Sequence, residues 1–133
     1  MNIATTTAAQ LMTNHLITIE PHESLRRAAA IMTQHRVHCL LVLASEPQRC
    51  LGVIAVKDIV QVLCEGDAHL LDQLRVSDAA TTPAFTVQKD FVIQDCIRLM
   101  RMAGVRSVPV LDGVVPVGVL SFTDIVRAVA VGA

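Results

Sequence analysis

The 133-residue sequence predicts an α+β fold made of two β-α-β-β-α units that pack about a pseudo-two-fold axis. The first observation behind this prediction is that the sequence matches itself when it is shifted by 68 residues, so that Thr18 falls on Thr86. The second is an apolar pattern of helical period in each half, and the third is a pair of short β-branched apolar runs after it. One unit of about 60 residues is marginal alone, so we expect the two units to bury their sheets against each other.

The internal match extends over most of the chain. Met32 falls on Met100, and residues 52–60 fall on residues 118–126 after a two-residue difference in one turn. We expect repeat 1 over residues 8–64, a linker over 65–77 with a short helical piece near 70–74, and repeat 2 over 78–131.

Each half is expected to contain the same elements in the same order. The expected strands are residues 17–19, 38–43 and 51–56 in the first half and 85–87, 106–111 and 115–120 in the second. Ser24 and Asp90 are the expected N-caps of the first helices, because short polar side chains accept from backbone N–H groups there. The second helices are expected to begin at about Lys57 and Thr123.

The composition excludes several classes of function. Hydrophobic residues make up 53% of the chain, which is enough for a core, and the net charge is −1 without a basic block. With three Phe and no Trp or Tyr, the chain also lacks stacking platforms, so nucleic acid is not an expected partner. The apolar runs are too short to cross a membrane and the N-terminus does not read as a signal peptide, so we expect a cytoplasmic protein.

The stretch from Gly104 to Asp124 is the main candidate for a site. It is expected to place Ser121, Thr123 and Asp124 where a strand passes into a helix, and a helix N-terminus can hold a phosphate. A structural alternative is that Ser121 and Asp124 only form a capping box. Pro109 could likewise mark only an edge or a bulge, since proline cannot donate to a strand ladder.

Other chemistry has weaker support in the sequence. His35, His38 and Cys39 are metal-ligand types, but their spacing crosses from a helix end into a strand and no second pair complements them, so no metal is expected. We find no motif for nucleophilic catalysis, no phosphate-binding loop of the Walker type and no convincing carboxylate pair. An enzyme is therefore not expected.

On these residues, the chain resembles the cystathionine-β-synthase (CBS) domain, which normally occurs as a tandem pair. The resemblance covers roughly residues 8–130 and is carried best by Gly104, by residues 108–110, and by Gly118, Ser121 and Asp124. It implies a stand-alone regulatory module that binds AMP, ADP, ATP or S-adenosylmethionine in the cleft between the repeats and needs no cofactor. It also implies a homodimer that acts on an unknown effector protein in trans. A protein-interaction module without a ligand is the alternative.

The resemblance also implies roles for individual residues of the second repeat. The ligand-binding residues would be Phe85, Thr86, Arg106, Val108, Pro109, Ser121, Thr123 and Asp124. In the family the aspartate binds the ribose hydroxyls, the Ser or Thr lies near the phosphates, and residues around the proline and the opening Thr strand enclose adenine. Arg106 would neutralise a phosphate.

The first repeat departs from this pattern. Arg36 stands in place of Gly104, and Leu41 and Ala55 replace the proline and the serine of the second repeat. The residues expected to form a weaker second site are Thr18, His38 and Asp58. We therefore predict one competent site and one weak or altered site in each chain.

Overall fold

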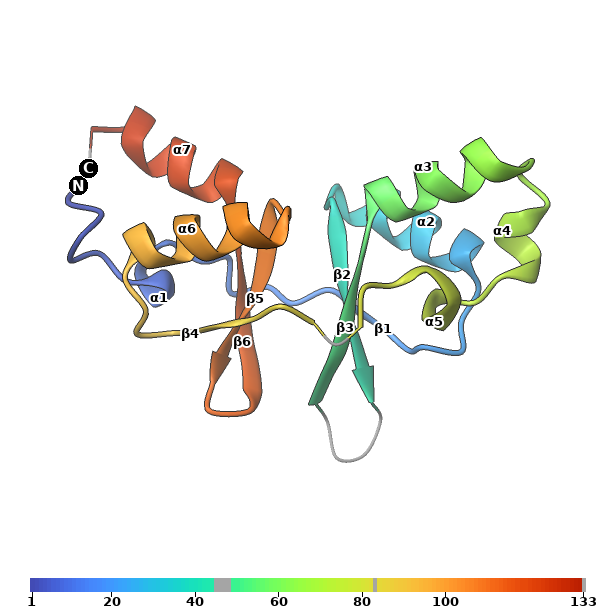
Figure 1. Cartoon of the computed structure of the whole chain (residues 1–133), viewed down its shortest axis with the longest axis horizontal. Helices are drawn as coiled ribbons and strands as arrows, with labels where there is room; N and C mark the ends of the chain where they lie inside the picture. The colour runs from blue at the N-terminus through green and yellow to red at the C-terminus, as the bar shows by residue number, and fades with distance from the viewer. Residues whose placement is uncertain (45–48, 83, 133) are drawn as a thin grey trace. The chain divides into compact units, whose positions relative to one another are not determined.

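The computed structural model describes residues 1–44, 49–82 and 84–132, and it confirms the mixed α+β fold (Figure 1). The chain divides into two compact units. The first-repeat unit is Ile17–Ala84, and the second-repeat unit joins Met1–Leu16 to Phe85–Ala133. The pseudo-two-fold arrangement of the repeats stays a prediction.

The first-repeat unit contains a three-stranded sheet and helices. Its elements are β1 (Thr18–Ile19), α2 (Leu25–His35), β2 (Cys39–Ala44), β3 (Arg49–Ala55), α3 (Val56–Glu65), α4 (Leu70–Gln73) and α5 (Val76–Ala79). The helical piece expected near residues 70–74 is therefore present as α4. The stretch expected as a linker also contributes the buried side chains of Leu71 and Val76 to the core of this unit.

The second-repeat unit has the same strand-helix-strand-strand-helix run, preceded by the short helix α1 (Ala8–Leu11). Its other elements are β4 (Val87–Gln88), α6 (Ile93–Ala103), β5 (Ser107–Asp112), β6 (Val115–Ser121) and α7 (Phe122–Ala130). The second helices α3 and α7 each begin one residue before the positions expected from the sequence.

The two sheets share one topology. Their strand orders are β1-β2-β3 and β4-β5-β6, and each middle strand pairs parallel with the first strand and antiparallel with the third. The antiparallel register shifts after Val42 in one sheet and after Val110 in the other, at equivalent positions. The sequence repeat is thus a repeat of backbone structure, including its irregularity.

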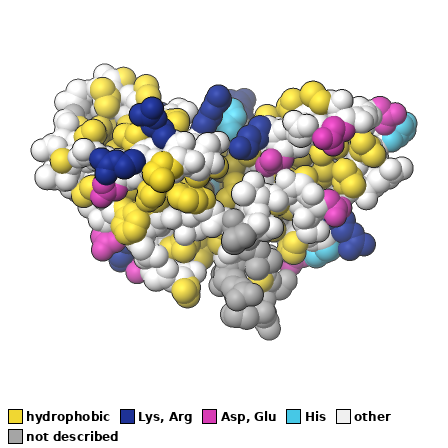
Figure 2. Space-filling model, in the orientation of Figure 1, with side chains coloured by type: hydrophobic (Ala, Val, Ile, Leu, Met, Phe, Trp, Pro, Cys, Tyr) yellow, Lys and Arg dark blue, Asp and Glu magenta, His cyan; other side chains and the backbone are white. Residues whose placement is uncertain are grey.

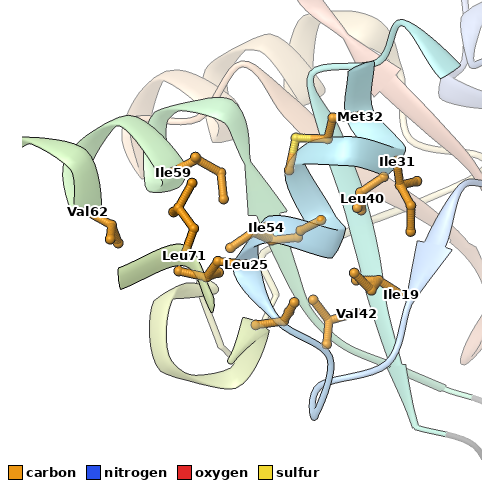
Figure 3. Close-up of a cluster of buried hydrophobic side chains, with 12 residues drawn as sticks. Ile19, Leu25, Ile31, Met32, Leu40, Val42, Ile54, Ile59, Val62 and Leu71 are labelled. Carbon is orange, nitrogen blue, oxygen red and sulfur yellow. The ribbon is translucent and has the colours of Figure 1, made fainter. Parts of the chain in front are cut away.

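The first-repeat core lies between the sheet and the helices α2, α3 and α4. Figure 3 shows Leu25 and Met32 of α2 directed toward Ile54 of β3, with Ile59 of α3 in the same cluster. Burying side chains of this size contributes roughly 1.5–3 kcal/mol each. The second-repeat core is built in the same way, with Met100 of α6 at the position equivalent to Met32.

Of the two N-caps predicted from the sequence, one is confirmed and one is wrong. Ser24 caps α2 as predicted, because its side chain accepts from the Arg27 N–H at 3.1 Å. The Asp90 prediction is wrong: the N-cap of α6 is Val92, which has no side-chain acceptor. The first N–H groups of α6 find backbone partners instead, since Ile93 donates to the Thr6 carbonyl at 2.7 Å.

Residues 1–16 are an integral part of the second-repeat unit. The Ala8 N–H donates to the Phe91 carbonyl at 2.8 Å, and Ala8 is fully buried. Further along, Thr13 and Val119 exchange two backbone hydrogen bonds of 2.9 and 3.0 Å. This N-terminal segment therefore caps α6 and adds a bridge to β6.

In the first-repeat unit, residues 74–81 make the equivalent contacts. The Leu25 N–H donates to the Leu74 carbonyl at 3.1 Å, and Thr81 exchanges hydrogen bonds of 2.9 and 3.1 Å with Val53. In each unit, then, the segment that caps the long helix and bridges the third strand lies outside the strand-helix-strand-strand-helix run.

Candidate functional site

The start of α7 is fixed by a reciprocal pair of hydrogen bonds. The Ser121 hydroxyl accepts from the Asp124 N–H at 3.1 Å, and the Asp124 carboxylate accepts from the Ser121 N–H at 2.9 Å. The capping box that the sequence offered as a structural alternative is therefore present. It accounts for one oxygen of the carboxylate and leaves the second for other contacts.

The second oxygen of Asp124 faces two donors. The Thr13 hydroxyl donates to Oδ1 at 3.2 Å, and Nη1 of Arg127 lies 3.5 Å from the same atom. Only 9% of the Asp124 side-chain surface is exposed, whereas 68% of the Arg127 side chain is exposed. A carboxylate held in one orientation beside hydroxyls can accept from the vicinal hydroxyls of a sugar.

Arg106 is tied to the same helix end through its backbone. Its carbonyl accepts from the Phe122 N–H at 3.0 Å, and the next residue, Ser107, pairs with Ser121 across the sheet. The side chains of Arg106 and Thr123 are exposed. The first turn of α7 therefore carries an exposed hydroxyl on Thr123, and the backbone that it joins belongs to a residue with an exposed cationic side chain.

The residues that lead into β4 lie beside Pro109. The β4–β5 register pairs Val87 with Val110, so Thr86 precedes the first pair of the ladder. At the equivalent place in the first-repeat unit, the Leu41 N–H donates to the Ile17 carbonyl at 3.0 Å. Proline has no N–H, so this bond has no counterpart at the Phe85 carbonyl.

Val108 and Pro109 point to opposite faces of β5. Val108 is fully buried in the hydrophobic cluster of the second-repeat unit, so only its backbone is available to a ligand. Pro109 is also buried, and Leu41, its equivalent in the first repeat, is buried without belonging to the core cluster of that unit.

The first-repeat unit has a simpler arrangement at the equivalent positions. Asp58 accepts from the Ala55 N–H at 2.7 Å, but Ala55 has no hydroxyl to complete the pair. The His38 carbonyl accepts from the Val56 N–H at 2.9 Å, as the Arg106 carbonyl does from Phe122. Thr18 is exposed and is the first residue of β1, where it pairs with Leu41 of β2.

Two residues that lie beside Asp124, Thr13 and Arg127, were not predicted from the sequence. Thr13 belongs to the opening of the chain and was not expected beside the second repeat. The internal repeat could have indicated Thr13, because Thr13 and its equivalent Thr81 each precede the first strand of a repeat. Arg127 could have been found from its spacing, since residues three apart on a helix are neighbours.

Among the residues that the structure describes, no group of three or more His, Cys, Asp or Glu side chains is arranged to hold a metal ion. None of the helices described has both the length and the apolar character needed to span a bilayer.

The sequence repeats match a known family model. The model of the CBS domain matches twice, over residues 8–65 and 76–131. The chain belongs to the CBS domain family. CBS domain pairs are regulatory modules that often bind adenosine ligands.

Three curated proteins are similar to the chain over 84–94% of its length. Hypoxic response protein 1 of Mycobacterium tuberculosis is 29% identical over 124 residues, which cover 92% of this chain and 84% of that protein. Against two uncharacterized archaeal relatives, from Methanopyrus kandleri and Methanocaldococcus jannaschii, the chain spans 57% and 32% of their length.

Solved structures show the same fold. A conserved protein from Pyrococcus horikoshii superposes with a TM-score of 0.86 at 19% identity, covering 97% of this chain and 95% of that chain. The CBS domain pair of protein MJ0100, in complex with 5′-methylthioadenosine and S-adenosyl-L-methionine, has a TM-score of 0.84 at 21% identity and covers 96% of this chain and 98% of that chain. At these identities the likeness shows the fold alone.

Proposed function

We propose that this CBS domain pair is a sensor that binds an adenosine-containing ligand at the second repeat. The observation that carries the proposal is the Asp124 carboxylate, which is shielded, oriented by Ser121 and Thr13, and placed on the first turn of α7. Its free acceptor capacity suits the two vicinal hydroxyls of a ribose. The nearby Arg106 side chain and the N-terminal end of α7 favour a negatively charged phosphate or carboxylate on the same ligand.

In this proposal the residues just before β4 contact the adenine. The Phe85 carbonyl lacks the backbone donor that Leu41 gives in the other repeat, so it can accept from an exocyclic amine. The Phe85 ring is partly exposed and offers an apolar surface for a purine. In this proposal Thr86 and Pro109 line the same place.

The first repeat would bind such a ligand weakly or not at all. Ala55 contributes no hydroxyl, and the Leu41 N–H already occupies the Ile17 carbonyl. His38 replaces Arg106, and an imidazole lacks the fork of N–H donors with which a guanidinium holds a phosphate. These differences support one competent site per chain.

We also propose that the functional form is a homodimer. The helices α3 and α7 each bury one apolar face in their own core and leave a second apolar face exposed, with Val60 and Leu63 on α3 and Val126 and Val129 on α7. These residues are equivalent in the two repeats, so the same kind of surface occurs twice in each chain. Figure 2 shows hydrophobic side chains reaching the surface over the helices of both units. A second copy would cover them, and a separate effector protein would respond to the liganded dimer.

A thermal-shift experiment tests the ligand proposal. AMP, ADP, ATP, S-adenosylmethionine and NAD are added in turn, and a ligand at 100 times its Kd should stabilise the protein by about 2.7 kcal/mol. Asp124→Asn should abolish the shift, and the matched variant Asp58→Asn should retain it. Absence of a shift with all five compounds would instead favour a protein-interaction module without a ligand.

A further inference from the structure

We propose that Thr13 is a positioning residue of the ligand site, and that the N-terminal segment of residues 1–16 is therefore part of that site. This inference rests on the proposed function, and it assigns a role to a residue 111 positions away from Asp124 in the sequence. Thr13 acts through Asp124: its hydroxyl holds the carboxylate in the orientation that a ribose would meet.

The contact is supported by a rigid backbone. Thr13 exchanges two backbone hydrogen bonds with Val119, which lies on β6 two residues before Ser121. The approach is close because Gly118 has no side chain: a Cβ at that position would lie 2.5 Å from Sδ of Met12 and 2.9 Å from the Thr13 carbonyl oxygen. The hydroxyl of Thr13 is thus presented by a fixed strand-like segment and not by a free loop.

The other donors near Asp124 are placed differently from Thr13. The Ser121 N–H donates to Oδ2. Arg127 is largely exposed and lies 3.5 Å from Oδ1, so its long side chain is a weak and screened partner. The two oxygens rotate together, so the Ser121 N–H on Oδ2 and the Thr13 hydroxyl on Oδ1 hold the carboxylate plane from both sides, and Thr13 supplies the second restraint. A carboxylate has four acceptor positions, so two remain for ribose hydroxyls beside the Ser121 N–H and the Thr13 hydroxyl.

The first repeat provides an internal control. Thr81 makes the same two-bond bridge to Val53, and Gly52 permits the same close approach to the Thr81 carbonyl. Among the hydrogen bonds of the described residues, however, the Thr81 hydroxyl has none to Asp58. Backbone docking is therefore common to both repeats, whereas the hydroxyl-to-carboxylate contact belongs to the repeat whose site we consider competent.

The test compares Thr13→Val, Thr13→Ser and Thr81→Val in the full chain. Valine keeps the β-branched shape and the backbone bridge but removes the hydroxyl, and serine restores the hydroxyl. Titration calorimetry with AMP, ATP and S-adenosylmethionine should give a Kd about tenfold higher for Thr13→Val, within threefold of wild type for Thr13→Ser, and unchanged for Thr81→Val. Equal affinities of wild type and Thr13→Val would overturn the inference and leave the proposed function intact.

A ligand-free measurement separates the two proposals. Hydrogen exchange of the Ser121 amide reports how firmly Asp124 holds it, because that amide donates to Oδ2. Faster exchange in Thr13→Val than in Thr81→Val supports the positioning role even if wild type binds none of the three compounds, a result that would remove the proposed ligand alone. Unchanged exchange of that amide in Thr13→Val overturns the positioning role.

Discussion

Arg36 and Gly104 end the long helices of the two repeats in the same left-handed backbone conformation, with φ of 55° and 68°. Glycine adopts this conformation without a steric cost, but a residue with a Cβ pays roughly 1 kcal/mol. The first repeat therefore has the same backbone geometry as the second without a glycine at this position.

Replacing this arginine should stabilise the protein. We expect Arg36→Gly to raise the free energy of unfolding by about 0.5–1 kcal/mol in urea denaturation, because strain is removed at a modest entropic cost. Gln34→Gly, inside the last turn of α2, should instead lower it by about 1 kcal/mol. Loss of stability in Arg36→Gly would show that the arginine makes a compensating interaction.

The capping box of α7 should transfer to α3. Ser121→Ala is expected to cost about 1 kcal/mol, because the Asp124 N–H loses its acceptor. Ala55→Ser should gain about 0.5–1 kcal/mol, since Asp58 already accepts from the residue 55 N–H and the new hydroxyl completes the pair. Both changes are measured by equilibrium unfolding, and a neutral result for Ala55→Ser would contradict the equivalence of the two helix starts.

The exposed apolar faces of α3 and α7 should control the oligomeric state. Val126→Glu is expected to shift the protein toward monomer in sedimentation velocity, because it places a charge on a face that a second copy would cover. The control is Val114→Glu at the β5–β6 turn, which is exposed and outside both helices. If both variants keep the wild-type sedimentation coefficient, the homodimer does not use these faces.

The cysteines should differ in reactivity. Burial, with a smaller contribution from Asp95, raises the pKa of the Cys96 thiol to about 11, while Cys64 is exposed. A thiol reagent at pH 8 should modify Cys64 in the folded protein and reach Cys96 only on unfolding. Because the folded state resists ionisation of Cys96, stability should fall as pH rises from about 9 toward 11, and Cys96→Val should lose this part of the pH dependence. Rapid native labelling of Cys96 would contradict its burial.

Much of the fold could be predicted because each pattern occurs in both repeats and is therefore supported twice. Met32 and Met100 share a phase of the helical pattern, and both lie in the cores of their units. The N-cap of α6 could not be predicted in this way, because its donors are satisfied by backbone carbonyls of residues far away in the sequence. The sequence around Asp90 therefore contains no local signal for these distant partners.

The candidate site shows the same limit. Ser121 and Asp124 are three residues apart, and their mutual hydrogen bonds follow from that spacing. The contact between Thr13 and Asp124 depends on which unit the N-terminal segment joins, and that choice is made by long-range packing. The core position of Val108 likewise follows from strand alternation, which the motif resemblance does not address.

The stoichiometry of binding decides whether each chain holds one competent adenosine-ligand site. Titration calorimetry of the wild-type chain with AMP, ATP and S-adenosylmethionine should give about one site per chain for the preferred compound, and none for Asp124→Asn. Two equal sites per chain, or binding that survives Asp124→Asn, would contradict the account.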